Sequence, residues 1–141
     1  MMKGFTLAAE FRHKSWFSAK AGTQTLALER KLDLVNVIVD EPNTSTNSIP
    51  AVWEYTNPQL ALVRLHGRNH ATWNIKDAAA ASSRFNYDYT DEELTALAEQ
   101  IREIARHVQR THVVFNNNWE DQGQRNAKTL MQILGVNAIQ P

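Results

Sequence analysis

The sequence contains no cysteine among its 141 residues. This absence excludes disulfide bonds, thiolate metal sites and a cysteine nucleophile together. The formal net charge is also zero, because 15 basic side chains balance 15 acidic ones. A globally basic surface for nucleic acid or membranes is therefore not indicated, although a local basic patch stays an alternative.

Long apolar runs are missing as well. No stretch approaches the roughly 18 apolar residues of a membrane-spanning helix, and residues 1–5 lack the apolar region of a signal peptide. We therefore expect a cytoplasmic protein that makes no membrane contact. The length predicts a single domain, residues 1–141, and no second domain. A chain of this length has enough residues to bury a hydrophobic core.

Several motifs that indicate a particular cofactor or reaction are absent too. The sequence has no glycine-rich dinucleotide fingerprint, no phosphate-binding P-loop, no Gly-x-Ser-x-Gly elbow and no His-Glu-x-x-His pair. A nucleotide-binding Rossmann domain and a serine hydrolase are therefore disfavoured, and we expect no cofactor and no metal.

Four apolar, β-branched stretches are present, and each runs into a polar cluster and then a tryptophan. The stretches with their clusters span residues 7–13, 34–42, 60–69 and 112–118, and the tryptophans are Trp16, Trp53, Trp73 and Trp119. Such runs are typical of buried strands. Polar residues at the C-terminal ends of successive strands are typical of the active face of an α/β protein.

Helices are predicted between these strands. Thr90 and Glu93 form a capping box that opens a helix reaching Val108, and a second helix is predicted from Gln124 to Leu134, with a weaker one at 21–31 and another at 50–55. This alternation predicts parallel strands joined by right-handed crossovers. The segment 67–89 is too long for a simple connector and is predicted to carry or cover the functional site.

Five sequence words, in this order, carry a family resemblance. They are residues 10–17 (Glu-Phe-Arg-His-Lys-Ser-Trp-Phe), 40–42 (Asp-Glu-Pro), 63–69 (Val-Arg-Leu-His-Gly-Arg-Asn), 87–89 (Tyr-Asp-Tyr) and 115–117 (Phe-Asn-Asn). Together they resemble the domain-of-unknown-function 72 family (YecE-like), from about Phe5 to Gly135, and the pair Asn126-Ala127 also fits. The resemblance implies a TIM-type (β/α)8 barrel and no settled activity.

A complete barrel of this type has eight strands and typically about 250 residues. The chain supplies four strand units and resembles only the C-terminal half of the family. We therefore expect an α/β fold that is half of a TIM-type barrel, with four parallel strands and outer helices, and with the N-terminal half absent.

Side chains two residues apart on a strand share a face. Glu10 and Arg12 form one such pair, and Arg64 and His66 form another. Because a helix-facing arginine is costly to bury, both pairs are predicted to face the barrel axis and to converge at its C-terminal mouth. Asp40 or Glu41, and Asn116, are expected to join them from the intervening strands.

The predicted roles follow from this chemistry. Glu10, Asp40 and His66 are the acid–base candidates, and Arg64 and Arg68 are candidate electrostatic clamps for phosphate or carboxylate. The other ligand-binding candidates are Arg12, His13, Trp16, Glu41, Asn69, Asn116 and Asn117.

Structural interpretations compete with these roles. The charged pairs are equally well explained as a salt-bridge layer that fills the barrel interior. Asn117 and Asn118 are better explained by turn chemistry, and the tryptophans by pinning loops to the rim. A metal site of oxygen and nitrogen ligands is only weakly indicated, since no characteristic spacing supports it.

The leading functional hypothesis is a barrel mouth that binds a small anionic, phosphate-bearing ligand, as a hydrolase or lyase. The first alternative is a non-catalytic, truncated half-barrel that forms a homodimer or assembles with a partner supplying the missing half. The second is nucleic-acid binding through arginine and tryptophan.

Overall fold

The computed structural model describes residues 2–43, 48–74 and 83–135 of the chain. Its elements, in order, are β1 (Leu7–Ala9), η1 (Lys14–Phe17), α1 (Ala21–Lys31), β2 (Leu34–Asp40), β3 (Leu60–Leu65), α3 (Asp91–Ala105), β4 (Arg110–Phe115) and α4 (Gln122–Leu134). None of the helices in these described ranges is long and apolar enough to cross a membrane.

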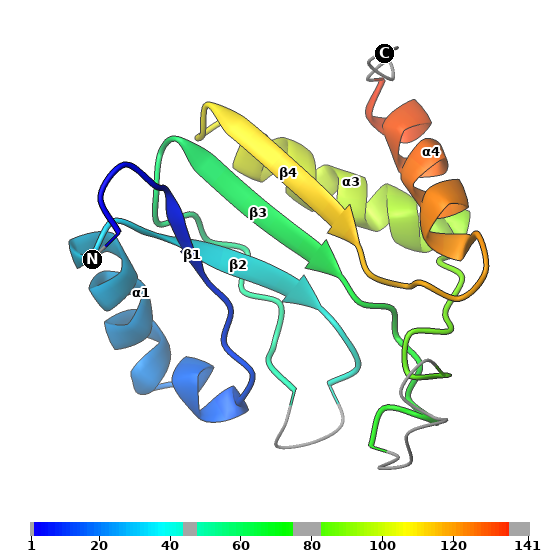
Figure 1. Ribbon diagram of the computed structural model, residues 1–141, viewed down its shortest axis with the longest axis horizontal. Coiled ribbons are helices and arrows are strands. Elements are labelled where there is room, and N and C mark those ends of the chain that lie inside the picture. The colour runs from blue at the N-terminus through cyan, green and yellow to red at the C-terminus, as the bar shows by residue number, and fades with distance from the viewer. Residues whose placement is uncertain (1, 44–47, 75–82, 136–141) are drawn as a thin grey trace.

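The four strands form one parallel sheet in the order β1-β2-β3-β4 (Figure 1). Each strand lies beside the next strand along the chain. Helix α1 connects β1 to β2 and helix α3 connects β3 to β4 on the outer side, whereas the described residues between β2 and β3 form no helix. The prediction of four parallel strands with outer helices, half of a TIM-type barrel, is confirmed.

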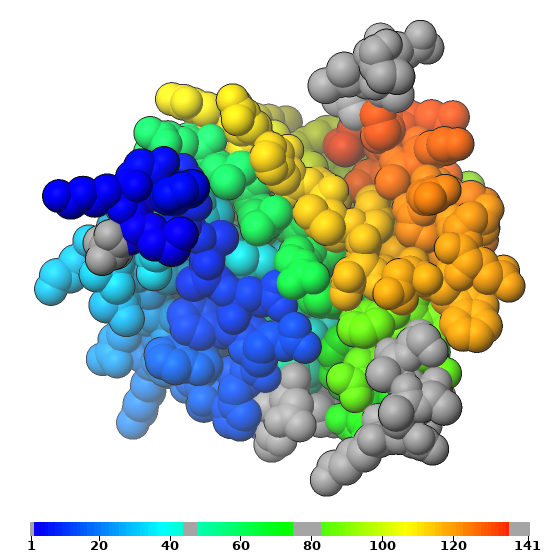
Figure 2. Space-filling view, viewed as in Figure 1, coloured from blue at the N-terminus to red at the C-terminus, as the bar shows by residue number. Residues whose placement is uncertain are grey.

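Alternate residues of the strands pack into two layers. Ile38, Val63 and Leu65 face the helices and pack with the buried stripe of α3, which includes Leu94 and Ile101. The opposite, inner side of the sheet is turned toward the viewer in Figure 2, where side chains of β1, β3 and β4 (blue, green and yellow) form the molecular surface. No helix of the described chain covers this inner face.

The helix termini follow the local sequence. The hydroxyl of Thr90 accepts a hydrogen bond from the Glu93 N–H at 3.2 Å, and the Glu93 carboxylate accepts one from the Thr90 N–H at 3.0 Å. The predicted capping box is therefore confirmed, and Gly135 (φ 72°) ends α4 in the left-handed region as expected. Val108 lies beyond the end of α3.

The predicted helix at 50–55 is wrong, because these residues have an irregular path. The side-chain amide of Asn36, on β2, donates to the carbonyls of Val52 at 3.3 Å and Glu54 at 3.0 Å. A helix would need such carbonyls for its own N–H groups, so the tertiary contact replaces the local structure.

Gly67 turns the chain after β3 with φ +88°. A Cβ at this position would lie 2.6 Å from the Cβ of Tyr87, and the Gly67 N–H donates to the Tyr89 hydroxyl at 2.9 Å. The start and the end of the segment 67–89 are thus fixed against each other. Positions 75–82 of that segment lie outside the described residues, so its role as a cover stays a prediction.

Glu29, on α1, is a buried carboxylate with an exposed fraction of 1%. Neither of its oxygens has a hydrogen-bond partner among the described residues. Burial raises its pKa from 4.5 to about 7, although the charge of Arg30 acts in the opposite direction.

Replacing Glu29 by glutamine is expected to remove a pH dependence of stability. The stability tied to this raised pKa is fully present below about pH 4.5 and is lost as the pH rises through about 7. Relative to the parent, Glu29→Gln should thus gain up to ~2–3 kcal/mol at pH 8 and little at pH 4. Urea unfolding at both pH values measures this, with the exposed Glu99→Gln as control; an equal difference at both pH values would contradict it.

Candidate functional site

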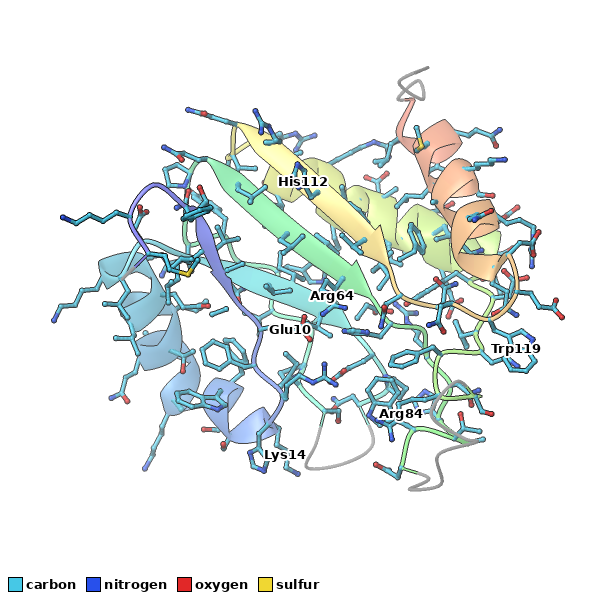
Figure 3. The ribbon with its side chains drawn as sticks, viewed as in Figure 1. Glu10, Lys14, Arg64, Arg84, His112 and Trp119 are labelled. Atoms are coloured by element: carbon cyan, nitrogen blue, oxygen red, sulfur yellow. The ribbon has the colours of Figure 1, made fainter. Side chains whose placement is uncertain are left out.

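Four charged or titratable side chains meet on the inner face, at the carboxyl ends of β1 and β3. The Glu10 carboxylate accepts hydrogen bonds from the guanidinium of Arg12, at 2.9 Å, and from that of Arg64. The His66 Nε2 atom lies 3.6 Å from the same carboxylate. Figure 3 shows Glu10 and Arg64 directed toward each other across the sheet. The residues predicted to share the barrel-facing side are thus brought together.

His66 is the most enclosed member of this group, with a side-chain exposure of 2%. The side-chain nitrogen of Asn116 lies 3.0 Å from His66 Nδ1. With the amide donating, Nδ1 is the acceptor and a neutral ring carries its proton on Nε2, toward Glu10. Nε2 has no hydrogen-bond partner within reach among the described residues. Trp73 and Phe85 enclose the ring, with centroids 6.4 and 5.9 Å away.

Glu41 follows β2 and belongs to the same site. Its Oε1 accepts a hydrogen bond from the Ile49 N–H at 2.8 Å, while its Oε2 is buried without a partner among the described residues. Burial raises the pKa of Glu41, and the charges of His66, Arg12 and Glu10 act on it as near neighbours. A buried carboxyl with one free oxygen can hold a proton for transfer.

The pKa values of Glu10 and Glu41 are therefore shifted in opposite directions. The pKa of Glu10 falls from 4.5 to about 2, because of the nearby His66 ring, 3.6 Å away, and then the hydrogen bonds from Arg64 and Arg12, against the opposing effect of burial. The pKa of Glu41 is raised by burial. Carboxyl groups whose environments separate their pKa values are suited to the roles of base and acid.

Asp40 and Arg68 form a different cluster. Arg68 donates from Nε and Nη2 to both oxygens of Asp40, at 2.8 to 3.2 Å, and from Nη1 to Glu93 at 3.1 Å. The Tyr89 hydroxyl donates to Asp40, and the Tyr87 hydroxyl donates to Glu93, both at 2.7 Å. The structure therefore places these two predicted site residues together, but not with Glu10.

This second cluster is paired internally. Asp40 is nearly buried, with a side-chain exposure of 9%, and its hydrogen bond together with the opposing charge raises the pKa of Arg68. An arginine fork already held by two carboxylates has few donors left for a ligand.

Two of the predicted asparagines also have structural partners. The side-chain nitrogen of Asn117, a buried residue, donates to the Tyr87 carbonyl at 2.8 Å and to Asn126 Oδ1 at 2.7 Å. That of Asn69 donates to the carbonyls of Ser83 at 3.2 Å and Asn86 at 2.9 Å. These bonds favour the turn and loop interpretation for both asparagines.

His13 and Trp16 lie at the 3-10 helix η1, at the rim of the site. His13 is its N-cap, and the ring Nδ1 accepts from the Ser15 N–H at 3.2 Å. Trp16 is 46% exposed and packs against Phe11 with ring centroids 4.8 Å apart. Both contacts hold the rim, and neither side chain touches Glu10 in the contacts described above.

Asn126, on α4, holds the segment around Tyr89 against this helix. The sequence alone assigned it no functional role. Its side-chain oxygen accepts from the Tyr89 N–H at 3.1 Å and from Asn117, and its side-chain nitrogen donates to Asp88 at 3.0 Å and to the Tyr89 carbonyl at 3.2 Å. Two signals in the sequence pointed to Asn126: its position beside the apolar stripe of this helix, and the pair Asn126-Ala127 in the family resemblance. No group of three or more acidic or histidine side chains in the described ranges has an arrangement that could hold a metal ion.

The parallel sheet, the outer helices and a charged cluster at the strand ends define a protein of the TIM-barrel class. The chain matches the family model described as "Protein of unknown function DUF72" over residues 1–141. It therefore belongs to this family, as the sequence words predicted.

Similarity to individual proteins supports the same family assignment. The chain is 31% identical over 131 residues to UPF0759 protein YunF of Bacillus subtilis (strain 168), covering 92% of this chain and 46% of that protein. A DUF72 family protein of Enterococcus faecalis V583 is 33% identical with a TM-score of 0.91, over 99% of this chain and 51% of the other. One of Thermotoga maritima MSB8 is 32% identical with a TM-score of 0.81, over 94% and 47%. The chain thus spans about half the length of these relatives.

Proposed function

We propose that the cluster of Glu10, Arg12, Arg64, His66 and Glu41 binds a small anionic, phosphate-bearing ligand and can perform acid–base chemistry on it. The observation that carries this proposal is the geometry of the two guanidiniums. They point at one carboxylate from two strand ends, while 58% of the Arg12 side chain and 30% of the Arg64 side chain remain exposed. Arginine forks keep further donors after one bond to a carboxylate, and those donors suit phosphate.

The chemistry follows from the separated pKa values. Ionised Glu10 is placed to accept a proton, and Glu41 is placed to hold one. His66, whose Nδ1 lies 3.0 Å from the side-chain nitrogen of Asn116, can pass a proton between them or donate to the ligand from Nε2. A hydrolase or a lyase needs one group that takes a proton and one that gives it, so either reaction class fits.

Arg64→Gln is expected to weaken binding of inorganic phosphate and of a simple phosphate monoester by about 10-fold to 100-fold, because a charged donor pair is lost. Isothermal titration calorimetry on the purified protein measures this. Arg125→Gln is the matched control, since Arg125, on α4, is bonded to Asp121 at the start of that helix and to Asp88 before α3, and to no residue of the cluster in these ion pairs. Equal phosphate affinity of Arg64→Gln and the parent, both folded by circular dichroism, would refute the assignment.

The second candidate function is assembly, and a specific observation favours it. The inner face carries exposed apolar and charged side chains, including Val114, which is 43% exposed. The solved relatives continue for about as many residues again as this chain covers. We therefore also propose that the sheet is completed by a further polypeptide, and that the site functions in the completed barrel. Nucleic-acid binding gains no such support, because the formal net charge of the chain is zero.

A further inference from the structure

A cleft of about 430 Å³ lies beside β4, between this strand and the helices α3 and α4. Its walls are apolar: Val113 and Phe115 come from the strand, and Ile101 and Leu130 come from the helices. Exposed apolar surfaces of a folded protein mark sites of contact with another polypeptide or a ligand.

The strand side of the cleft is the helix-facing side of β4. Thr111, Val113 and Phe115 alternate along β4 and all line the cleft. The Thr111 hydroxyl is buried there without a hydrogen-bond partner among the described residues. The cleft therefore continues the layer between sheet and helices past the last strand.

The free edge of β4 borders this cleft. β4 pairs with β3 from Leu60↔Arg110 to Leu65↔Phe115, and no described strand pairs with its other edge (Figure 1). An edge strand presents unpaired N–H and C=O groups to a further strand. A strand added there in parallel would direct every second side chain into the cleft.

The length of the relatives indicates the source of that strand. Ninety-nine per cent of this chain superposes on 51% of the Enterococcus faecalis protein, so about half of that protein lies outside the match. Barrels of this class close by pairing the last strand with the first. The unmatched half is therefore the element whose strand belongs beside β4.

We infer that the cleft between α3, α4 and β4 is a socket for branched apolar side chains of a parallel strand, supplied by a polypeptide equivalent to the relatives' unmatched half. This inference rests on the proposed assembly and identifies the surface at which the two polypeptides would meet, namely the cleft and the free edge of β4. A second copy of this chain fits the socket less well. Among the described strands, β1 is the edge strand that could continue the sheet in parallel beside β4. It has three residues, of which Leu7 and Ala9 are on the helix side, against six residues in β4.

The test is co-expression of this chain with the unmatched half of the Enterococcus faecalis protein, produced as a separate tagged polypeptide. Light scattering after tag purification should show a 1:1 complex. Ala105→Trp, at an exposed position that lines the cleft, should lower the recovered complex by about tenfold or more, because the indole occupies the socket. Ala96→Trp, also exposed on α3 but outside the cleft, should leave it unchanged.

Three results would overturn the inference. They are the absence of a complex, a complex that Ala105→Trp and Ala96→Trp affect equally, and a homodimer of this chain that Ala105→Trp dissociates. Phosphate titration of the same samples separates this test from that of the ligand site. The cleft lies on the helix side of the sheet and Arg64 on the inner side, so absence of a complex with the parent chain, while phosphate binding is intact, would overturn the proposed docking surface alone.

Discussion

Arg68→Ala is expected to lower the free energy of unfolding by about 3 kcal/mol. Arg68 holds both oxygens of the nearly buried Asp40 and also bonds Glu93. Without its guanidinium, Asp40 keeps only the Tyr89 hydroxyl among these partners, and a poorly solvated carboxylate is left without its counter-ion. Urea-induced equilibrium unfolding at pH 7, followed by tryptophan fluorescence, measures the change.

A rescue variant and a control make this result specific. Adding Asp40→Asn to Arg68→Ala should restore part of the lost stability, because the unpaired charge is removed. Arg125→Ala should leave the unfolding free energy nearly unchanged, since its two ion pairs are exposed. If Arg68→Ala retained its stability while phosphate affinity fell sharply, Arg68 would be the ligand clamp that its sequence position suggests.

Asn126→Ala is expected to cost about 3 kcal/mol of unfolding free energy. One amide side chain makes four hydrogen bonds, and its loss leaves the N–H and C=O of Tyr89 and the amide of Asn117 without these partners in a buried region. Each buried polar group left unpaired carries its own desolvation cost, which exceeds the loss of packing from a side chain of this size.

The matched control for this variant is Gln124→Ala, an exposed position on the same helix that should change stability little. Chemical denaturation of both variants gives the comparison. A cost for Asn126→Ala no larger than that of the control would show that water replaces the amide's partners. The joining of the 87–89 segment to α4 would then need another explanation.

Much of the fold could be predicted from local patterns. The β-branched runs indicated the four strands, the capping box of Thr90 indicated the start of α3, and Gly135 indicated the end of α4. The irregular path at 51–55 could not be predicted, because the partner of its carbonyls is Asn36, which is distant in sequence.

The inner-face pairing was also accessible from the sequence. Glu10 and Arg12, like Arg64 and His66, stand two residues apart at strand ends, and strand geometry alone places each pair on one side. The contacts among the pairs follow once the strands are parallel in one sheet, because the carboxyl ends of β1 and β3, on either side of β2, then lie at the same edge.

The sequence by itself thus determined the family, the parallel half-barrel and the convergence of Glu10 with Arg64 and His66. Only the tertiary structure decided whether Asp40 or Glu41 joins the Glu10 cluster on the inner face, and it is Glu41. Consecutive residues point to opposite faces, but β2 is buried on both faces, so its apolar run has no alternation from which the facing could be read. The tertiary structure also decided the partners of Arg68, because Arg68 reaches Asp40 only after Gly67 turns the chain back toward that residue.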